Sequence, residues 1–260
     1  MNASITLSVC TSSVFFGVPL VEALPRVRAA GASVYEFWSW WDQDLEAAAA
    51  VGRDLGLTPA AMCTRFFTLN DPDRLDEYRR DLRESLDAAA ILGCRRLITQ
   101  VGQDRPGVSR QAQHDAIAAG LRACAPMLED RGVTLLVEPL NARVDHPGYY
   151  LTGSDEGFEL IREVQSPNVK LLFDIYHQQI TEGDLLRRLT ANLSDVGHLH
   201  IAGNPGRHEP CEGSEVDYPT LLCALADAGY TGCAGLEYFP RGDADASLRR
   251  TLEALGGISG

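Results

Sequence analysis

Short runs of apolar, often β-branched residues alternate along the chain with stretches in which apolar residues recur every three or four positions. The first pattern predicts buried strands of a parallel sheet, and the second predicts helices with one buried face. We expect eight strands, at 4–10, 34–38, 57–65, 96–101, 135–138, 169–174, 196–200 and 233–237. Alternation with helices predicts a parallel sheet, and eight such units predict closure into an α/β (β/α)8 TIM barrel. A doubly wound open sheet is the alternative, but no Gly-x-Gly-x-x-Gly turn follows the first strand to support it.

Capping residues and glycines set the expected helix boundaries between these strands. We expect helices at 20–30, 44–55, 72–92, 109–130, 154–164, 181–189, 217–228 and 248–255. Pro25 predicts a kink or a late start in the first of them, and Pro126 predicts a break in the fourth. Ser154 is expected to cap the helix at 154–164, and Thr181 is expected to open the helix at 181–189.

Each of the last four expected strands ends in a residue that can bind a metal or move a proton. These residues are Glu138, Asp174, His200 and Glu237. The C-terminal ends of barrel strands surround a single mouth, so the four side chains should converge there. A single acid at a strand end is more often a loop cap or an ion-pair partner, and a lone histidine is more often a core residue. The joint occurrence of all four therefore favours a site.

Three carboxylates confined together would repel one another, and a divalent cation removes that conflict. Three oxygen donors with one imidazole suit Mg²⁺ or Mn²⁺ and allow Co²⁺, whereas zinc is less favoured without cysteine ligands. A cation on the two oxygens of an α-hydroxy carbonyl acidifies the neighbouring C–H bond. Glu138 and Glu237 could then remove and return that proton from either side of the substrate. Aldose–ketose isomerisation and epimerisation both need this machinery.

Length and charge narrow the class of protein. The 260 residues suit one barrel, so we expect a single domain over 1–260, and 45% hydrophobic content suffices for its core. A net charge of −13 repels phosphate backbones and anionic lipid heads, which disfavours nucleic-acid and membrane partners. We expect a small-molecule substrate, and a homo-oligomer is allowed.

The seven cysteines indicate the compartment. Their number is odd and they include no Cys-x-x-Cys pair, which favours reduced thiols in a cytoplasmic protein over a disulfide framework or a zinc ribbon. The start of the chain lacks the basic region and apolar run of a signal peptide. The chain contains no run of 18 apolar residues, which a membrane-spanning helix would need.

Four stretches resemble the hydroxypyruvate isomerase family of xylose-isomerase-like TIM barrels. They lie at 137–141, 173–179, 198–210 and 235–238, and the third is the most specific. The resemblance extends over the whole chain and implies a metal-dependent isomerase.

The resemblance also implies roles for individual residues. It assigns metal binding to the four strand-end residues named above and acid/base roles to the two glutamates among them. His177 resembles a histidine that contacts substrate oxygens in related ketose epimerases, and Arg207 resembles an arginine that reaches the substrate. We therefore predict that His177 and Arg207 bind substrate.

Two departures from the family leave the substrate open. Many members carry glutamine where this chain has His200, and a histidine there resembles the ketose 3-epimerase branch. Residues 212–218 also replace the family's usual Gly-Glu-Ile-Asn-Tyr-like run.

Three enzyme hypotheses follow. The first is an isomerase of a small hydroxy-oxo acid, either of the hydroxypyruvate/tartronate semialdehyde type or a 2-oxo-tetronate, because Arg207 can pair with a carboxylate. The second is a ketose 3-epimerase or sugar isomerase acting on neutral substrates, which His200 favours. The third is an inosose-dehydratase-like lyase that uses the same enolate chemistry.

Two further hypotheses are weaker. A metal-cluster endonuclease would want more than six histidines and a basic face, whereas this chain is acidic. A non-catalytic metal-binding barrel does not explain both mouth glutamates. Trp38, Trp40 and Trp41 follow the second strand, where they could line the pocket, form a subunit contact or only pack.

Overall fold

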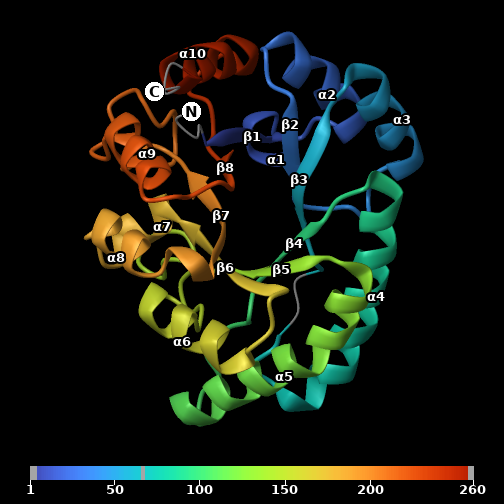
Figure 1. Cartoon of the computed structure of the whole chain (residues 1–260), viewed down its shortest axis with the longest axis vertical. Helices are drawn as coiled ribbons and strands as arrows, with labels where there is room; N and C mark the ends of the chain where they lie inside the picture. The colour runs from blue at the N-terminus through green and yellow to red at the C-terminus, as the bar shows by residue number, and fades with distance from the viewer. Residues whose placement is uncertain (1–4, 66–67, 257–260) are drawn as a thin grey trace.

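Eight parallel strands form a closed barrel in chain order, which confirms the predicted TIM barrel (Figure 1). The structure is a computed structural model that describes residues 5–65 and 68–256. The strands are β1 (Thr6–Cys10), β2 (Val34–Phe37), β3 (Thr58–Cys63), β4 (Arg96–Thr99), β5 (Thr134–Val137), β6 (Val169–Asp174), β7 (Val196–Ile201) and β8 (Cys233–Leu236). β8 pairs with β1 and closes the ring. Residue 4 of the expected first strand lies outside the described residues.

Helices surround the barrel on its outside (Figure 1). They are α1 (Thr11–Val14), α2 (Leu20–Ala29), α3 (Leu45–Leu55), α4 (Leu75–Leu92), α5 (Arg110–Arg131), α6 (Ser154–Val164), α7 (Ile175–Thr181), α8 (Leu185–Ala191), α9 (Tyr218–Asp227) and α10 (Ala244–Gly256), with 3₁₀ turns η1 (Pro72–Arg74) and η2 (Leu193–Asp195). Asp44 caps α3 by accepting a hydrogen bond from the backbone of Ala47, and Gly56 ends it in the left-handed conformation. These capping signals explain why most helix boundaries could be predicted.

Two helices continue through an internal proline, so α2 has no late start at Pro25 and α5 has no break at Pro126. α2 begins at Leu20 and runs through Pro25, and α5 continues without a break past Pro126. A proline removes one backbone donor and crowds the preceding turn. In α5 the neighbouring Cys124 and Leu128 are fully buried, so packing of this face holds the helix together across the proline.

The segment after β6 differs from the predicted helix at 181–189. α7 starts directly after the strand, because the side chain of Asp174 accepts a hydrogen bond from the backbone N–H of His177 at 3.1 Å. Thr181 ends this helix, and α8 is a separate element. Ser154 is the first residue of α6 rather than its cap, and its hydroxyl donates to Glu182.

Apolar side chains fill both sides of the barrel wall. A small cluster lies inside the barrel: Ala61, Cys63, Ile98, Leu136 and Leu172. The larger core lies between the strands and the surrounding helices. Both faces of each strand are thus buried, which is why the strands consist of continuous apolar runs.

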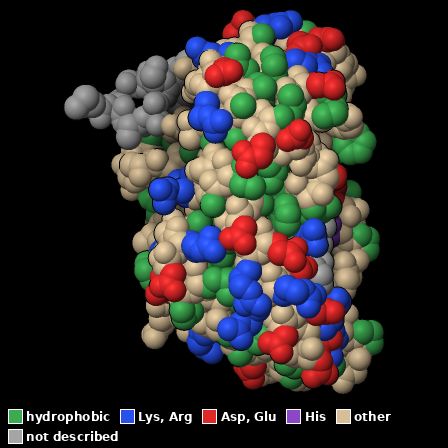
Figure 2. Space-filling view, turned by 90° about the vertical axis from the view of Figure 1, so that its right-hand side faces the viewer, with side chains coloured by type: hydrophobic (Ala, Val, Ile, Leu, Met, Phe, Trp, Pro, Cys, Tyr) green, Lys and Arg blue, Asp and Glu red, His purple; other side chains and the backbone are tan. Residues whose placement is uncertain are grey.

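On the face shown in Figure 2, acidic and basic side chains alternate without a large patch of either sign. All seven cysteines are unpaired thiols. Within the described ranges, every helix is too short or too polar to cross a membrane.

Candidate active site

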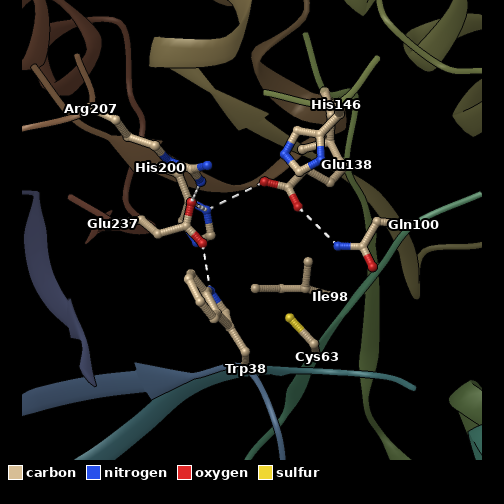
Figure 3. Close-up of a pocket in the computed structure, with 10 residues that line it drawn as sticks. Trp38, Cys63, Ile98, Gln100, Glu138, His146, His200, Arg207 and Glu237 are labelled. Carbon is tan, nitrogen blue, oxygen red and sulfur yellow. Dashed lines mark hydrogen bonds and ion pairs between the residues drawn. The ribbon is translucent and has the colours of Figure 1, made fainter. Parts of the chain in front are cut away.

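Four of the residues singled out in the sequence come together at the C-terminal mouth of the barrel. One ligand atom each from Glu138, Asp174, His200 and Glu237 lies within 4.8 Å of the others. All four side chains are buried. We call this group the mouth cluster. Figure 3 shows Glu138, His200 and Glu237 pointing toward one another.

The electrostatics of the mouth cluster fit a cation. Burial, together with the nearby charge of Glu237, raises the pKa of Asp174. Burial also disfavours the charge of Glu237, but Arg207 and His200 outweigh this and hold the pKa of Glu237 well below its usual range. Three buried carboxylates around one imidazole are the donor set that Mg²⁺ or Mn²⁺ accepts. These residues could therefore hold a divalent cation.

His200 faces the centre of the cluster through one nitrogen. Its Nδ1 atom lies 3.5 Å from Glu138 Oε1 and 3.5 Å from Glu237 Oε2, at the outer limit of a hydrogen bond. Burial disfavours an imidazolium here, but Glu237 and Glu36 outweigh it and raise the pKa of His200 in the metal-free protein. The nitrogen thus faces carboxylates without a well-formed bond, as a ligand atom would before a cation binds.

Each glutamate of the cluster divides its two oxygens between two environments. One oxygen of each faces the Nδ1 atom of His200. The other oxygen accepts a hydrogen bond from a neutral donor: Trp38 Nε1 to Glu237 Oε1 at 2.7 Å, and Gln100 Nε2 to Glu138 Oε2 at 3.5 Å (Figure 3). The oxygen of each glutamate that faces His200 could meet a cation, although that of Glu237 also pairs with Arg207, while the other oxygen lies toward a cavity.

That cavity has a volume of about 150 Å³. Besides members of the mouth cluster, its lining includes Trp38, Cys63, Ile98, Gln100, His146 and Arg207. Burial and the charges of Glu138 and Glu237 raise the pKa of Cys63 well above its usual range, so this cysteine stays a neutral thiol. The cavity therefore combines an acidic side with a neutral one.

Arg207 reaches the cavity from the loop after β7. Its backbone adopts a left-handed conformation with φ of 57°, and its N–H donates to the carbonyl of Gly203 at 2.8 Å. Its guanidinium pairs with Glu237 and lies 5.5 Å from the ring centroid of Tyr176. The structure thus brings Arg207 to the cavity as an ion-pair partner of a cluster glutamate, and its predicted contact with substrate stays a prediction.

His177 lies beside the cluster and is fully buried. Its Nε2 atom is 3.6 Å from Asp174 Oδ2, and its ring packs edge-on against His146, which lines the cavity. Burial is the main reason that the pKa of His177 falls to about 3, so the ring is neutral. The predicted substrate contact of His177 also stays a prediction.

Asn141 selects the tautomer of His177. The Oδ1 atom of Asn141 accepts hydrogen bonds from the backbone N–H groups of Val144 and Asp145, at 2.9 and 3.2 Å. Its amide nitrogen must then face His177, where it lies 2.6 Å from Nδ1. Nδ1 is therefore an acceptor and the proton of the neutral ring is on Nε2. His177 can donate a hydrogen bond from Nε2 but cannot accept one there.

Several residues of this region were missed in the sequence. Glu36, Gln100 and His198 received no role, although an acid within the apolar strand 34–37 is a signal that could have identified Glu36. Of the three tryptophans, Trp38 lines the cavity. Trp40 instead donates a hydrogen bond to Ser85 at 3.2 Å, away from the mouth.

A family model described as xylose isomerase-like TIM barrel matches residues 24–256. A 2-oxo-tetronate isomerase from Cupriavidus necator is 37% identical over 177 residues, which cover 68% of this chain and 67% of the relative. A hydroxypyruvate isomerase from Escherichia coli is 36% identical over 178 residues, covering 68% of both. The chain belongs to the hydroxypyruvate isomerase family of xylose isomerase-like TIM barrels. The prediction that it is an isomerase enzyme is thereby confirmed.

A solved structure has the same fold over nearly its whole length. A Brucella melitensis protein described as an AP endonuclease of family 2 superposes with a TM-score of 0.88 at 33% identity. The match covers 94% of this chain and 96% of that one. The architecture of this family thus extends over nearly the whole chain.

Proposed function

We propose that this isomerase acts on a small hydroxy-oxo acid of the hydroxypyruvate or 2-oxo-tetronate type. In this proposal the mouth cluster holds Mg²⁺ or Mn²⁺, with Co²⁺ as a substitute, and Glu138 and Glu237 transfer the proton. The observation that carries it is the division of each glutamate between the cluster centre and a cavity-side hydrogen bond. The names of the two curated relatives support the substrate class.

A divalent cation in the cluster would supply positive charge for the negative charge that develops on the two substrate oxygens. The rest of the chemistry belongs to the protein. One glutamate removes the proton from the carbon beside the carbonyl, and the ene-diolate then receives a proton at the neighbouring carbon. Since Glu138 and Glu237 come from β5 and β8 and face the same centre, they can act on the two carbons from different sides.

The neutral donors Trp38 and Gln100 hold the glutamate oxygens in place. A hydrogen bond to a carboxylate restricts its rotation and reduces its basicity without adding a charge. Trp38 makes the shorter contact, at 2.7 Å to Glu237, and Gln100 makes a longer one, at 3.5 Å to Glu138. We infer that Trp38 restrains Glu237 more firmly than Gln100 restrains Glu138.

Arg207 supports an acidic substrate. Its guanidinium lies at the cavity and already pairs with one carboxylate, that of Glu237. A guanidinium has five N–H donors, so a second carboxylate can share it. The Nε2–H of His177 would serve a substrate oxygen at the same end of the cluster.

A ketose 3-epimerase or sugar isomerase is the second candidate, because His200 occupies the position at which a histidine resembles that branch. An inosose-dehydratase-like lyase would use the same glutamates. An endonuclease, the activity named for the Brucella melitensis protein, is disfavoured here by the net charge of −13.

Proton exchange tests the proposal directly. Metal-stripped protein is incubated in D2O with hydroxypyruvate, a 2-oxo-tetronate or a ketose such as fructose, before and after addition of Mg²⁺. The loss of the proton signal beside the carbonyl is followed by NMR, with Glu237→Gln as the matched control. We expect Mg²⁺-dependent exchange with the acids and none with the control variant.

The outcomes separate the candidates. Exchange with fructose alone would favour the ketose epimerase, and loss of water from an inosose would favour the lyase. No exchange with any compound, in protein that binds Mg²⁺, would contradict the proton-transfer mechanism.

A further inference from the structure

A second buried polar cluster adjoins the mouth cluster, and the proposed mechanism assigns no role to it. Its centre is Glu36 on β2, whose exposed fraction is 1%. Glu36 Oε2 accepts hydrogen bonds from Ser8 Oγ at 2.7 Å and from His198 Nε2 at 2.8 Å. Glu36 Oε1 lies 2.7 Å from Nε2 of His200. One carboxylate therefore joins β1, β2 and β7.

The two contacts of Glu36 Oε2 are direct hydrogen bonds, and Glu36 Oε1 forms a close ion pair with His200 Nε2 that lacks hydrogen-bond geometry. This arrangement does not describe a second metal site. Glu36, His198 and His200 also form a group whose ligand atoms lie close enough to surround a cation. Two ligands at about 2.0–2.2 Å from a tetrahedral metal would be roughly 3.3–3.5 Å apart. The observed separations, 2.8 Å to His198 and 2.7 Å to His200, are shorter than two ligands of one metal ion would allow.

The carboxylate of Glu36 determines which nitrogen of His200 carries the proton. An ionised carboxylate has no proton and would repel a nitrogen lone pair at 2.7 Å, so the nitrogen beside it must be the protonated one. That nitrogen is Nε2, and the neutral ring then has its lone pair on Nδ1. Nδ1 is the atom that faces Glu138 and Glu237 in the mouth cluster.

The neighbouring strand leaves space for this contact. Gly235 on β8 lies against it, and a Cβ atom there would be 2.3 Å from Glu36 Oε1 and 2.7 Å from His200 Cδ2. Any side chain at this position would push the carboxylate and the imidazole apart. The contact between Glu36 and His200 therefore requires a glycine at position 235 on β8.

We propose that Glu36 is a positioning residue for the metal site, which holds His200 as the Nε2–H tautomer with Nδ1 directed at the cation. The inference rests on the proposed function, because it assumes that the mouth cluster binds a divalent cation. Carboxylates that hydrogen-bond a ligating histidine fix its ring and increase its basicity, and their loss typically weakens metal binding about 10–100-fold.

The first test measures Mn²⁺ affinity, by the EPR signal of free Mn²⁺ during titration of the protein. Glu36→Gln keeps the size of the side chain but removes its charge, and we expect Mn²⁺ to bind about 10–100-fold more weakly. Ser8→Ala is the matched control, because Ser8 contacts the other oxygen of the same carboxylate. We expect its Mn²⁺ affinity to stay within about threefold of the wild type.

A double-mutant cycle shows whether Glu36 acts through His200. His200→Asn keeps a polar atom near the position of Nδ1 but has none to reach Glu36. In that background, Glu36→Gln should change the Mn²⁺ affinity by less than about threefold. An equal effect of Glu36→Gln in both backgrounds would overturn the positioning role.

The failures of the two proposals are distinguishable. If wild-type protein binds no Mn²⁺, the proposed metal site fails. If the wild type binds Mn²⁺ and folded Glu36→Gln binds it equally well, only the role of Glu36 is overturned. If Glu36→Gln does not fold, ¹⁵N NMR of the histidine rings in Mg²⁺-loaded wild-type protein decides the matter. We expect the proton of His200 on Nε2, and a proton on Nδ1 would contradict the inference.

Discussion

The two halves of the barrel mouth differ in their chemistry. The half formed by β5 to β8 contributes the mouth cluster and Arg207, all of which bear or bind charge. The half formed by β1 to β4 contributes Trp38, Cys63, Ile98 and Gln100 to the same cavity. A neutral wall excludes water from one side of the substrate, so that charges on the other side act in a low dielectric. In the proposed mechanism, one half of the mouth transfers the proton and the other half orients the glutamates that transfer it.

The largest effect should come from the charged half. Glu237→Gln removes a proton acceptor but keeps the shape of the side chain, so we expect turnover and C–H exchange to fall by roughly 10²–10⁴-fold. Glu138→Gln should behave in the same way. Circular dichroism of each variant checks that the barrel is folded, and an active, folded Glu237→Gln enzyme would contradict the two-glutamate mechanism.

The next largest effect is expected at His177, if its Nε2–H group donates a hydrogen bond in the charged half. His177→Leu removes the Nε2–H group, and we expect kcat to fall about 10–100-fold, the loss expected for one hydrogen bond to a charged group. His177→Gln is the matched variant, because its amide nitrogen can replace Nε2 as donor. It should recover most of the activity; equal loss in both variants would assign His177 a packing role only.

A smaller effect should come from the neutral half. Trp38→Phe keeps an aromatic wall but removes the N–H that donates to Glu237, so we expect kcat to fall about tenfold with little change in KM. Trp40→Phe removes a comparable N–H that donates to Ser85 instead. If steady-state kinetics show equal losses for the two variants, the hydrogen bond of Trp38 does not orient the glutamate.

The smallest effect is expected for a residue outside both halves of the mouth. His114 on α5 is within 3.3 Å of Glu156 and 3.1 Å of Glu163 on α6. Burial disfavours its charge, but the two glutamates outweigh this and raise the pKa of His114. A raised pKa stabilises the fold below about pH 6.5, the unfolded value, and this contribution is lost as the pH rises through the folded pKa.

His114→Gln should therefore lower the Tm by roughly 1–2 °C at pH 5.5 and by less at pH 9. Calorimetry at the two pH values measures the difference. Activity at pH 7.5 should match the wild type, which would show that the contrast between the two halves of the mouth is chemical and does not reflect stability.

Local signals in the sequence predicted much of this architecture. Apolar runs that end at Glu138, Asp174, His200 and Glu237 placed four polar residues at strand ends, and the barrel topology alone required them to converge. The predicted break in α5 at Pro126 and the predicted late start of α2 were wrong, since packing against the barrel outweighs the local cost of one lost hydrogen bond.

The sequence by itself determined the fold, the family and the residues at the mouth, because period, caps and strand-end acids are properties of short segments. Only the tertiary structure decided the partners of those residues. Glu36 and His200 are 164 positions apart, and Trp38 and Glu237 are 199 apart, yet each pair is in contact at 2.7 Å. No local pattern encodes such a contact, since barrel closure and side-chain packing create it.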